Sequence, residues 1–275
     1  MQTGTVTSKD GTIIAFDRVG RGPVVILVDG AMGSRDGWGL RPLAERLAGH
    51  FTVYTYDRRG RGESGNTLPF ALEREIEDIE ALIDDAGGGA AHLYGISSGA
   101  ALALEAALAL GDRVAKLALY EAPYNSDETA RRNWKEYRRA LAELLAEDRR
   151  GDAVALFMKL VGADDEGVEG MRQSPMWPLM EAIGHTLAYD AEALGQDGSV
   201  PVARAARLAV PTLVMNGDAS YPFMHETAVA LAAAIPNAQH RVLAGQTHEV
   251  EVEALAPLLI TFFGDVRPVN RSHSA

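Results

Sequence analysis

Gly95-Ile96-Ser97-Ser98-Gly99 decides the fold of this 275-residue chain, because it joins two stretches of different character. An apolar run, Ala91 to Ile96, precedes it, and an alanine- and leucine-rich run, Ala100 to Leu110, follows it. We therefore expect a strand, a sharp turn and a helix. A serine at such a turn exposes its hydroxyl, and the flanking glycines let strand and helix approach without a Cβ clash. Ser97 is the candidate nucleophile.

Outward from this turn, the chain alternates strand and helix patterns. Strands are expected at 5–8, 12–19, 23–28, 51–56, 91–96, 116–120, 211–215 and 240–243, and helices at 40–48, 70–86, 100–110, 225–235 and 250–263. The turn Lys9-Asp10-Gly11 predicts that the first two strands form an antiparallel hairpin. The remaining alternation predicts a mostly parallel eight-stranded sheet flanked by helices, with functional groups gathered beyond the carboxyl ends of the strands.

The strand pattern breaks between Asn125 and Arg207, where the sequence is helical and mixed. We interpret 125–207 as an inserted helical cap, and 1–124 with 208–275 as the core. The methionines and tryptophans of the cap, Trp177 among them, favour an adaptable apolar wall for a bulky ligand. The alternative is that these side chains only pack the cap onto the sheet.

Composition excludes several classes of protein. Without cysteine the chain has no disulfide framework, thiol nucleophile or thiolate metal site. Its net charge of −12 argues against nucleic acid as a partner. The polar start, Met1 to Asp10, lacks a signal-peptide pattern, and no run is long enough to span a bilayer, so we expect a cytoplasmic protein without a membrane partner. Composition leaves a homodimer open.

Polar residues follow several of the expected strands, namely Asp29, Ser97, Glu121, Asp218 and His248. A serine hydroxyl needs a neighbouring base to become a nucleophile at neutral pH. Of seven histidines, His248 follows the last strand and lies at the same sheet edge as Ser97, so we expect it to be that base. A carboxylate must hold the histidine, and both Glu121 and Asp218 are candidates.

Attack on a carbonyl also needs backbone donors for the oxyanion. The Ser98 amide at the start of the helix is one candidate, and the loop after Pro23 to Val28 should supply another from Gly30 or Ala31. Asp29 in the same loop either touches the substrate or positions the loop.

These residues resemble the α/β-hydrolase superfamily over essentially the whole chain. The resemblance rests on the Gly95 to Gly99 turn, the Asp57 to Ser64 segment, the Gly-Gln-Thr-His248 turn and the helical insertion before Pro211. It implies an α/β-hydrolase fold, with a catalytic serine and a histidine base. Most relatives carry His-Gly where this chain has Asp29-Gly30, and they place the acid where Ser220 stands here.

The local motifs Val28-Asp29-Gly30, Gly95 to Ala100 and Glu121-Ala122-Pro123 look most like the lactone hydrolases that open the macrolactone of zearalenone. That resemblance implies Glu121 as the acid, Gly30 and Ser98 as oxyanion donors, and Trp177 in the substrate pocket. Asp218 stays the alternative acid.

The sequence therefore predicts a serine hydrolase that needs no metal or cofactor and cleaves an apolar small-molecule ester or lactone through an acyl-enzyme. Two other classes stay open. One is a receptor-like ligand-binding protein on the same scaffold, and the other is a non-hydrolytic lyase or oxygenase that uses His248 as its base.

Overall fold

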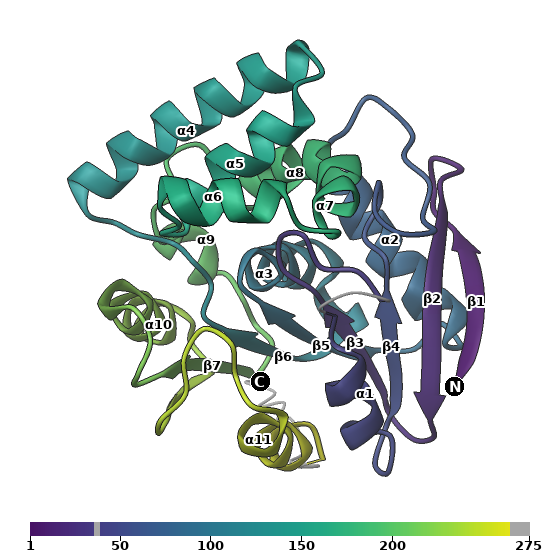
Figure 1. The fold of residues 1–275 in the computed structure, drawn as a ribbon. Coiled ribbons are helices and arrows are strands. Elements are labelled where there is room, and N and C mark those ends of the chain that lie inside the picture. Colours follow the sequence, from purple (N-terminus) through teal and green to yellow (C-terminus); the bar gives the residue numbers. More distant parts are fainter. Residues whose placement is uncertain (36–38, 265–275) are drawn as a thin grey trace.

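The computed structural model describes residues 1–35 and 39–264 and forms one eight-stranded sheet (Figure 1). The strands are β1 (Gln2–Thr7), β2 (Ile13–Gly20), β3 (Val24–Val28), β4 (Thr52–Tyr56), β5 (Ala91–Ile96), β6 (Val114–Tyr120), β7 (Thr212–Gly217) and β8 (Ala238–Leu243). Their spatial order is β1-β2-β4-β3-β5-β6-β7-β8. The β1–β2 and β2–β4 pairs are antiparallel and the others are parallel, so the expected mostly parallel sheet is confirmed.

The hairpin forms where its turn residues require it. Gly11 adopts a positive φ of 85°, and the Thr12 amide donates to Asp10 Oδ1 at 3.0 Å. An aspartate that bonds its own backbone two residues on is a common turn device, and glycine accepts the left-handed conformation at no steric cost. β1 and β2 consequently pair with Thr7 opposite Ile13.

Helices cover both faces of the sheet, and the parallel strands β3, β5 and β6 bury side chains on both of these faces. In β3, Ile26 and Val28 face a core shared with α2 (Leu72–Asp85), α3 (Ser98–Leu110) and α10 (Pro222–Ala234). Val25 and Leu27 face a second core with α1 (Arg41–Leu47) and α11 (Val252–Gly264). The strand order places β5 between β3 and β6, and Ser97 follows the carboxyl end of β5.

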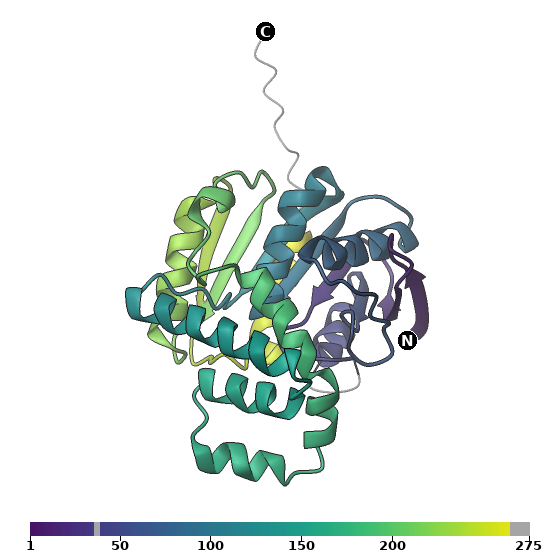
Figure 2. The same cartoon turned by 90° about the horizontal axis from the view of Figure 1, so that it is seen from above.

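Between β6 and β7 the chain forms the expected helices. They are α4 (Glu128–Ala146), α5 (Arg150–Leu160), α6 (Asp165–Arg172), α7 (Trp177–Ile183), α8 (Leu187–Leu194) and the short α9 (Val202–Ala205). Figure 1 shows α4 to α8 stacked above the sheet, and Figure 2 gives the same arrangement from above.

The helical insertion has a hydrophobic cluster of its own, which includes Leu141, Val154, Trp177 and Met180. The last part of the insertion packs against the sheet instead, because Leu194 of α8 and Ala205 of α9 belong to the core between the sheet and α3. The insertion is therefore anchored to the core through α8 and α9. The division at 125–207 stays a prediction.

No helix in the described part of the chain combines the length and apolar character needed to cross a membrane.

Candidate active site

Ser97 lies at a strained turn between β5 and α3. Its backbone has φ 55° and ψ −131°, a conformation that costs a non-glycine residue on the order of 1 to 3 kcal/mol. A Cβ at Gly95 would lie 2.4 Å from the Gly99 carbonyl oxygen, and one at Gly99 would lie 2.3 Å from the Val28 carbonyl oxygen. The two glycines are thus required by close backbone approach, and they hold Ser97 partly exposed at the sheet edge.

Glu121 follows β6, the neighbour of β5, and also has a positive φ, 47°. Its Oε1 accepts from the Gly217 amide at 2.9 Å. Its Oε2 accepts from the Ser220 hydroxyl at 2.7 Å and contacts His248 Nδ1 at 2.8 Å. The side chain is 0% exposed, so these partners replace the water that the carboxylate has lost.

The contact with Glu121 decides the tautomer of His248. An ionised carboxylate only accepts hydrogen bonds, so Nδ1 carries the proton and Nε2 of the neutral ring is left as the base. The His248 loop is held by the Tyr120 hydroxyl, which donates to the Thr247 carbonyl at 2.5 Å. Among the described residues, no hydrogen bond joins His248 to Ser97 Oγ.

Asp218 lies nearby but has a different partner. Its Oδ1 accepts from the Gly245 amide at 2.6 Å, and its own amide donates to the Leu243 carbonyl at 3.1 Å. The Asp218 carboxylate therefore closes the turn after β8. Of the two candidate acids, the fold brings Glu121 to His248.

The loop after β3 lies directly against the serine. A Cβ added at Gly30 would be 3.0 Å from Ser97 Cβ and 3.6 Å from Ser97 Oγ, so glycine keeps this approach open. The Gly30 amide donates to Asp29 Oδ1 at 2.8 Å. Within the described residues, the Ala31 amide makes no hydrogen bond. The Ser98 amide lies in the first turn of α3 and has no intrahelical acceptor.

Asp29 is placed in this loop with its carboxylate turned to the backbone of Gly30. Burial raises the pKa of Asp29 to about 6, although the Gly30 amide and the guanidinium groups of Arg61 and Arg58 act to lower it.

Three charged residues that lie next to this loop, Asp190, Arg58 and Arg61, were not predicted as site residues from the sequence. Asp190 of α8 accepts from Arg58 Nη1 at 2.6 Å, Arg61 Nη2 at 2.8 Å and Ser98 Oγ at 2.7 Å. Burial acts to raise the pKa of Asp190, but Arg61, Arg58 and the Ser98 hydrogen bond bring it below its usual value. The unusual arginine run after β4 was the one available signal, because three arginines directly after a buried strand need buried partners.

Trp177 lies within the hydrophobic cluster of the insertion. It is 8% exposed, and the Arg172 guanidinium lies over its ring, 4.7 Å from the centroid. The cluster also contains Met32 of the loop after β3, so the insertion touches that loop through apolar contacts. The contacts of Trp177 are those of a core residue of the insertion, and its predicted role at the substrate stays a prediction.

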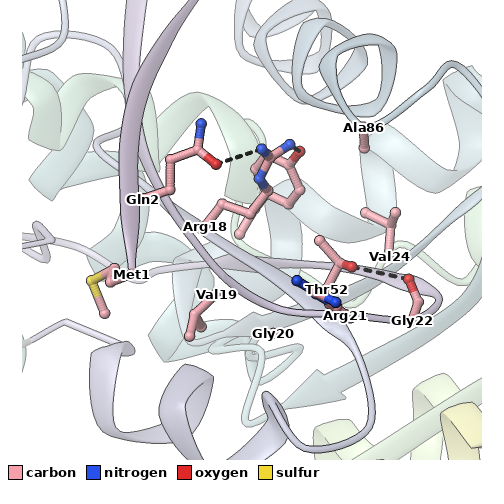
Figure 3. A pocket seen from close by; sticks show the side chains of 11 residues that line it. Met1, Gln2, Arg18, Val19, Gly20, Arg21, Gly22, Val24, Thr52 and Ala86 are labelled. Atoms are coloured by element: carbon pink, nitrogen blue, oxygen red, sulfur yellow. Dashed lines mark hydrogen bonds between the residues drawn. The ribbon is translucent and has the colours of Figure 1, made fainter.

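A separate cavity of about 590 Å³ lies at the opposite edge of the sheet, by the amino ends of β3 and β4 (Figure 3). Arg18, Gly20 and Thr52 are among its lining residues, and Arg18 donates to Gln2 at 2.6 Å there. Ser97, Glu121 and His248 do not line it. In the described residues, no three histidine, aspartate or glutamate side chains come together to hold a metal ion.

Comparisons with known proteins agree with this fold. The structure of an alpha/beta hydrolase from Sphaerobacter thermophilus is 51% identical; the match covers 94% of this chain and 100% of that chain, with a TM-score of 0.83. An esterase structure from Thermogutta terrifontis is 26% identical and covers 96% of each chain, with a TM-score of 0.69.

A putative carbamate hydrolase of Azorhizobium caulinodans is 32% identical over 123 residues, which is 44% of this chain and 46% of that protein. This chain thus matches less than half the length of that relative. The model of the alpha/beta hydrolase family matches residues 25–257. With the sheet order, the turn at Ser97 and this match over most of its length, the chain belongs to the α/β-hydrolase family.

Proposed function

We propose that this protein is a serine hydrolase that cleaves a carboxylic ester or lactone through an acyl-enzyme. The observation that carries the proposal is the hydrogen bond between His248 Nδ1 and Glu121 Oε2 at 2.8 Å, made at the same sheet edge as the strained Ser97. A serine on a sharp turn, a histidine and a buried carboxylate are the parts that acyl transfer needs.

In the proposed reaction, His248 Nε2 takes the proton of Ser97 Oγ as that oxygen attacks the substrate carbonyl. The serine–histidine contact is commonly long without substrate and shortens in the complex. Glu121 holds the ring and stabilises the imidazolium, which then protonates the leaving oxygen. Water, activated by the same histidine, hydrolyses the acyl-serine and regenerates the enzyme.

The oxyanion would be held by the Ser98 amide and a second amide from Gly30 or Ala31. The resemblance to lactone hydrolases implies Gly30, but the Gly30 amide already donates to Asp29 Oδ1 at 2.8 Å. The Ala31 amide has no hydrogen bond within the described residues that must break before it binds an oxyanion. Each such donor is typically worth about 10² to 10³ in kcat.

For the substrate we propose an apolar ester or lactone, macrolactones included. The name of the Thermogutta terrifontis esterase supports ester cleavage. The resemblance of Val28-Asp29-Gly30 and Glu121-Ala122-Pro123 to zearalenone lactone hydrolases supports a lactone. The apolar cluster that joins the insertion to Met32 supports an apolar ligand.

The test is a panel of p-nitrophenyl esters beside simple and macrocyclic lactones, with Ser97→Ala as the control and mass spectrometry of the serine peptide. Turnover, an acyl adduct on Ser97 and loss of several orders of magnitude in the control are expected. Fluorophosphonate labelling of Ser97 without turnover of any substrate would instead indicate a binding protein. An acyl adduct trapped on Ser97 would argue against a lyase or oxygenase, which would use His248 as a base without an acyl intermediate.

A further inference from the structure

Asp190 connects the helical insertion to the backbone around Ser97. Although it belongs to α8, 92 positions from Ser98 in the chain, its Oδ1 accepts from Ser98 Oγ at 2.7 Å and from Arg58 Nη1 at 2.6 Å. Its Oδ2 accepts from Arg61 Nη2 at 2.8 Å. Asp190 is 4% exposed and each arginine 1%, so these bonds form away from water.

Both arginines extend from Asp190 to carbonyl groups of the loop after β3. Arg61 Nη1 donates to the Gly30 carbonyl at 2.5 Å and lies 3.4 Å from the Gly33 carbonyl. Arg58 Nη1 lies 3.3 Å from the Asp29 carbonyl. Three carbonyl groups of this loop, those of Asp29, Gly30 and Gly33, are thus tied through guanidinium groups to one carboxylate of the insertion.

These carbonyl contacts also set the direction of the amides. The Gly30 carbonyl and the Ala31 amide belong to one planar trans peptide unit, so they point in opposite directions. When Arg61 holds the Gly30 oxygen, it fixes the line along which the Ala31 N–H points. Asp190 therefore acts on both segments that supply oxyanion donors: directly on Ser98, and through Arg61 on the peptide of Ala31.

We infer that Asp190 is a positioning residue for the oxyanion hole, supplied to the core by the helical insertion. This inference rests on the proposed function, because an oxyanion hole has meaning only for attack on a carbonyl. In this role Asp190 does not contact the substrate. Its carboxylate keeps Arg61 in one orientation, whereas Arg58 retains a second carboxylate partner in Glu75 at 2.7 and 2.8 Å.

The same molecule contains a matched ion pair that lacks this connection. Arg59 donates to Asp78 at 2.7 and 2.8 Å, and the side chains are 0% and 1% exposed. The other partners of Arg59 are Asp10 and the Arg74 carbonyl, none of which belongs to the loop after β3. Asp78→Asn thus removes a buried aspartate from an arginine without touching the oxyanion segments.

The experiment compares Asp190→Asn with Asp78→Asn in the full chain, using a p-nitrophenyl ester and its thionoester counterpart. Sulfur accepts hydrogen bonds weakly, so the ester-to-thionoester rate ratio reports on the oxyanion donors. In Asp190→Asn we expect kcat to fall by about 10² to 10³, the range for loss of one oxyanion donor. KM should change by less than about threefold, and the rate ratio should fall towards that of the uncatalysed reaction. In Asp78→Asn all three quantities should stay near wild type.

A second pair of variants covers the case in which Asp190→Asn does not fold. Arg61→Lys keeps the positive charge but loses the planar fork that spans Asp190 and the Gly30 carbonyl, and Arg59→Lys is its control. A lower kcat and a lower ester-to-thionoester rate ratio in Arg61→Lys, with both near wild type in Arg59→Lys, support the inference.

Unchanged rate ratios in Asp190→Asn and Arg61→Lys, or equal losses in the Asp78 and Arg59 variants, overturn the positioning role. A wild-type protein that hydrolyses no ester or lactone of the panel, whether or not Ser97 is labelled, overturns the proposed function itself, and the inference with it. The two failures are therefore distinguished by the wild-type measurement.

Discussion

At the scale of single residues, the Glu121 carboxylate accepts from three residues in two segments of the chain: Gly217 and Ser220 at the end of β7, and His248 after β8. The first two contacts hold the carboxylate while the third orients the base. Ser220 is informative here, because it stands where most relatives would place an acid and instead hydrogen-bonds to the acid that this chain uses in our proposal.

We predict that Glu121→Gln lowers kcat on an activated ester by about 10⁴, because an amide can present an N–H to His248 and favour the wrong tautomer. Asp218→Asn should keep kcat within about threefold, since Asp218 only accepts from the Gly245 amide. Steady-state kinetics of both variants, with circular dichroism as the folding control, measure this difference. The reverse ranking would make Asp218 the acid.

At the scale of elements, the strand, turn and helix that the sequence predicts around Ser97 differ little from those in the structure. β5 ends at Ile96 as expected, and α3 begins at Ser98, two residues before the expected start. Apolar runs and glycines report on local backbone, so most elements were predicted within a few residues.

Contacts between distant segments could not be predicted in this way. Neither the Asp190 partnership with Arg58 and Arg61 nor the position of Trp177 is encoded in local periodicity, because both depend on how the helical insertion packs. The sequence also does not decide which carboxylate holds His248. Glu121 and Asp218 follow neighbouring strands, and only the folded loops decide which carboxylate meets His248.

The strain of the turn predicts a difference in stability between two inactive variants. Ser97→Gly should be more stable than Ser97→Ala by about 1 kcal/mol, because glycine accepts φ 55° and alanine does not. For a domain of this size that corresponds to about 2 °C or more in Tm.

Calorimetry of both variants measures this difference. At an ordinary helical position such as Ala140 in α4, glycine should instead lower stability by about 1 kcal/mol. Equal Tm values for the two Ser97 variants would mean that the turn is not strained.

At the scale of the whole molecule, His92 links the central strand to the last helix. Its ring stacks on Phe263 with centroids 4.8 Å apart, and its Nδ1 has no hydrogen-bond partner among the described residues. Burial, helped by the charge of Lys116, lowers the pKa of His92 to about 4.

This shift predicts a loss of stability in acid. His92 stays neutral in the folded protein, whereas the unfolded chain takes up a proton below pH 6.5, so protonation favours unfolding as the pH falls from 6.5 towards 4. The loss should reach about 3 kcal/mol near pH 4. Denaturant unfolding at pH 7.5 and pH 4.5 measures it, and His92→Phe, which keeps the stack on Phe263, should remove most of it. Parallel pH profiles for the two proteins would contradict this assignment.

The attachment of α8 limits how the insertion can be exchanged in protein engineering. Arg61 donates hydrogen bonds to Thr186 and Asp190, at 3.1 and 2.8 Å, so this part of the insertion is fixed to the core by buried side-chain contacts. The helices α4 to α7 precede these contacts and carry none of them. A chimera should therefore take α4 to α7 from a relative and rejoin this chain before Thr186, which changes most of the hydrophobic cluster of the insertion and keeps the hydrogen bonds of Arg61 to Thr186 and Asp190.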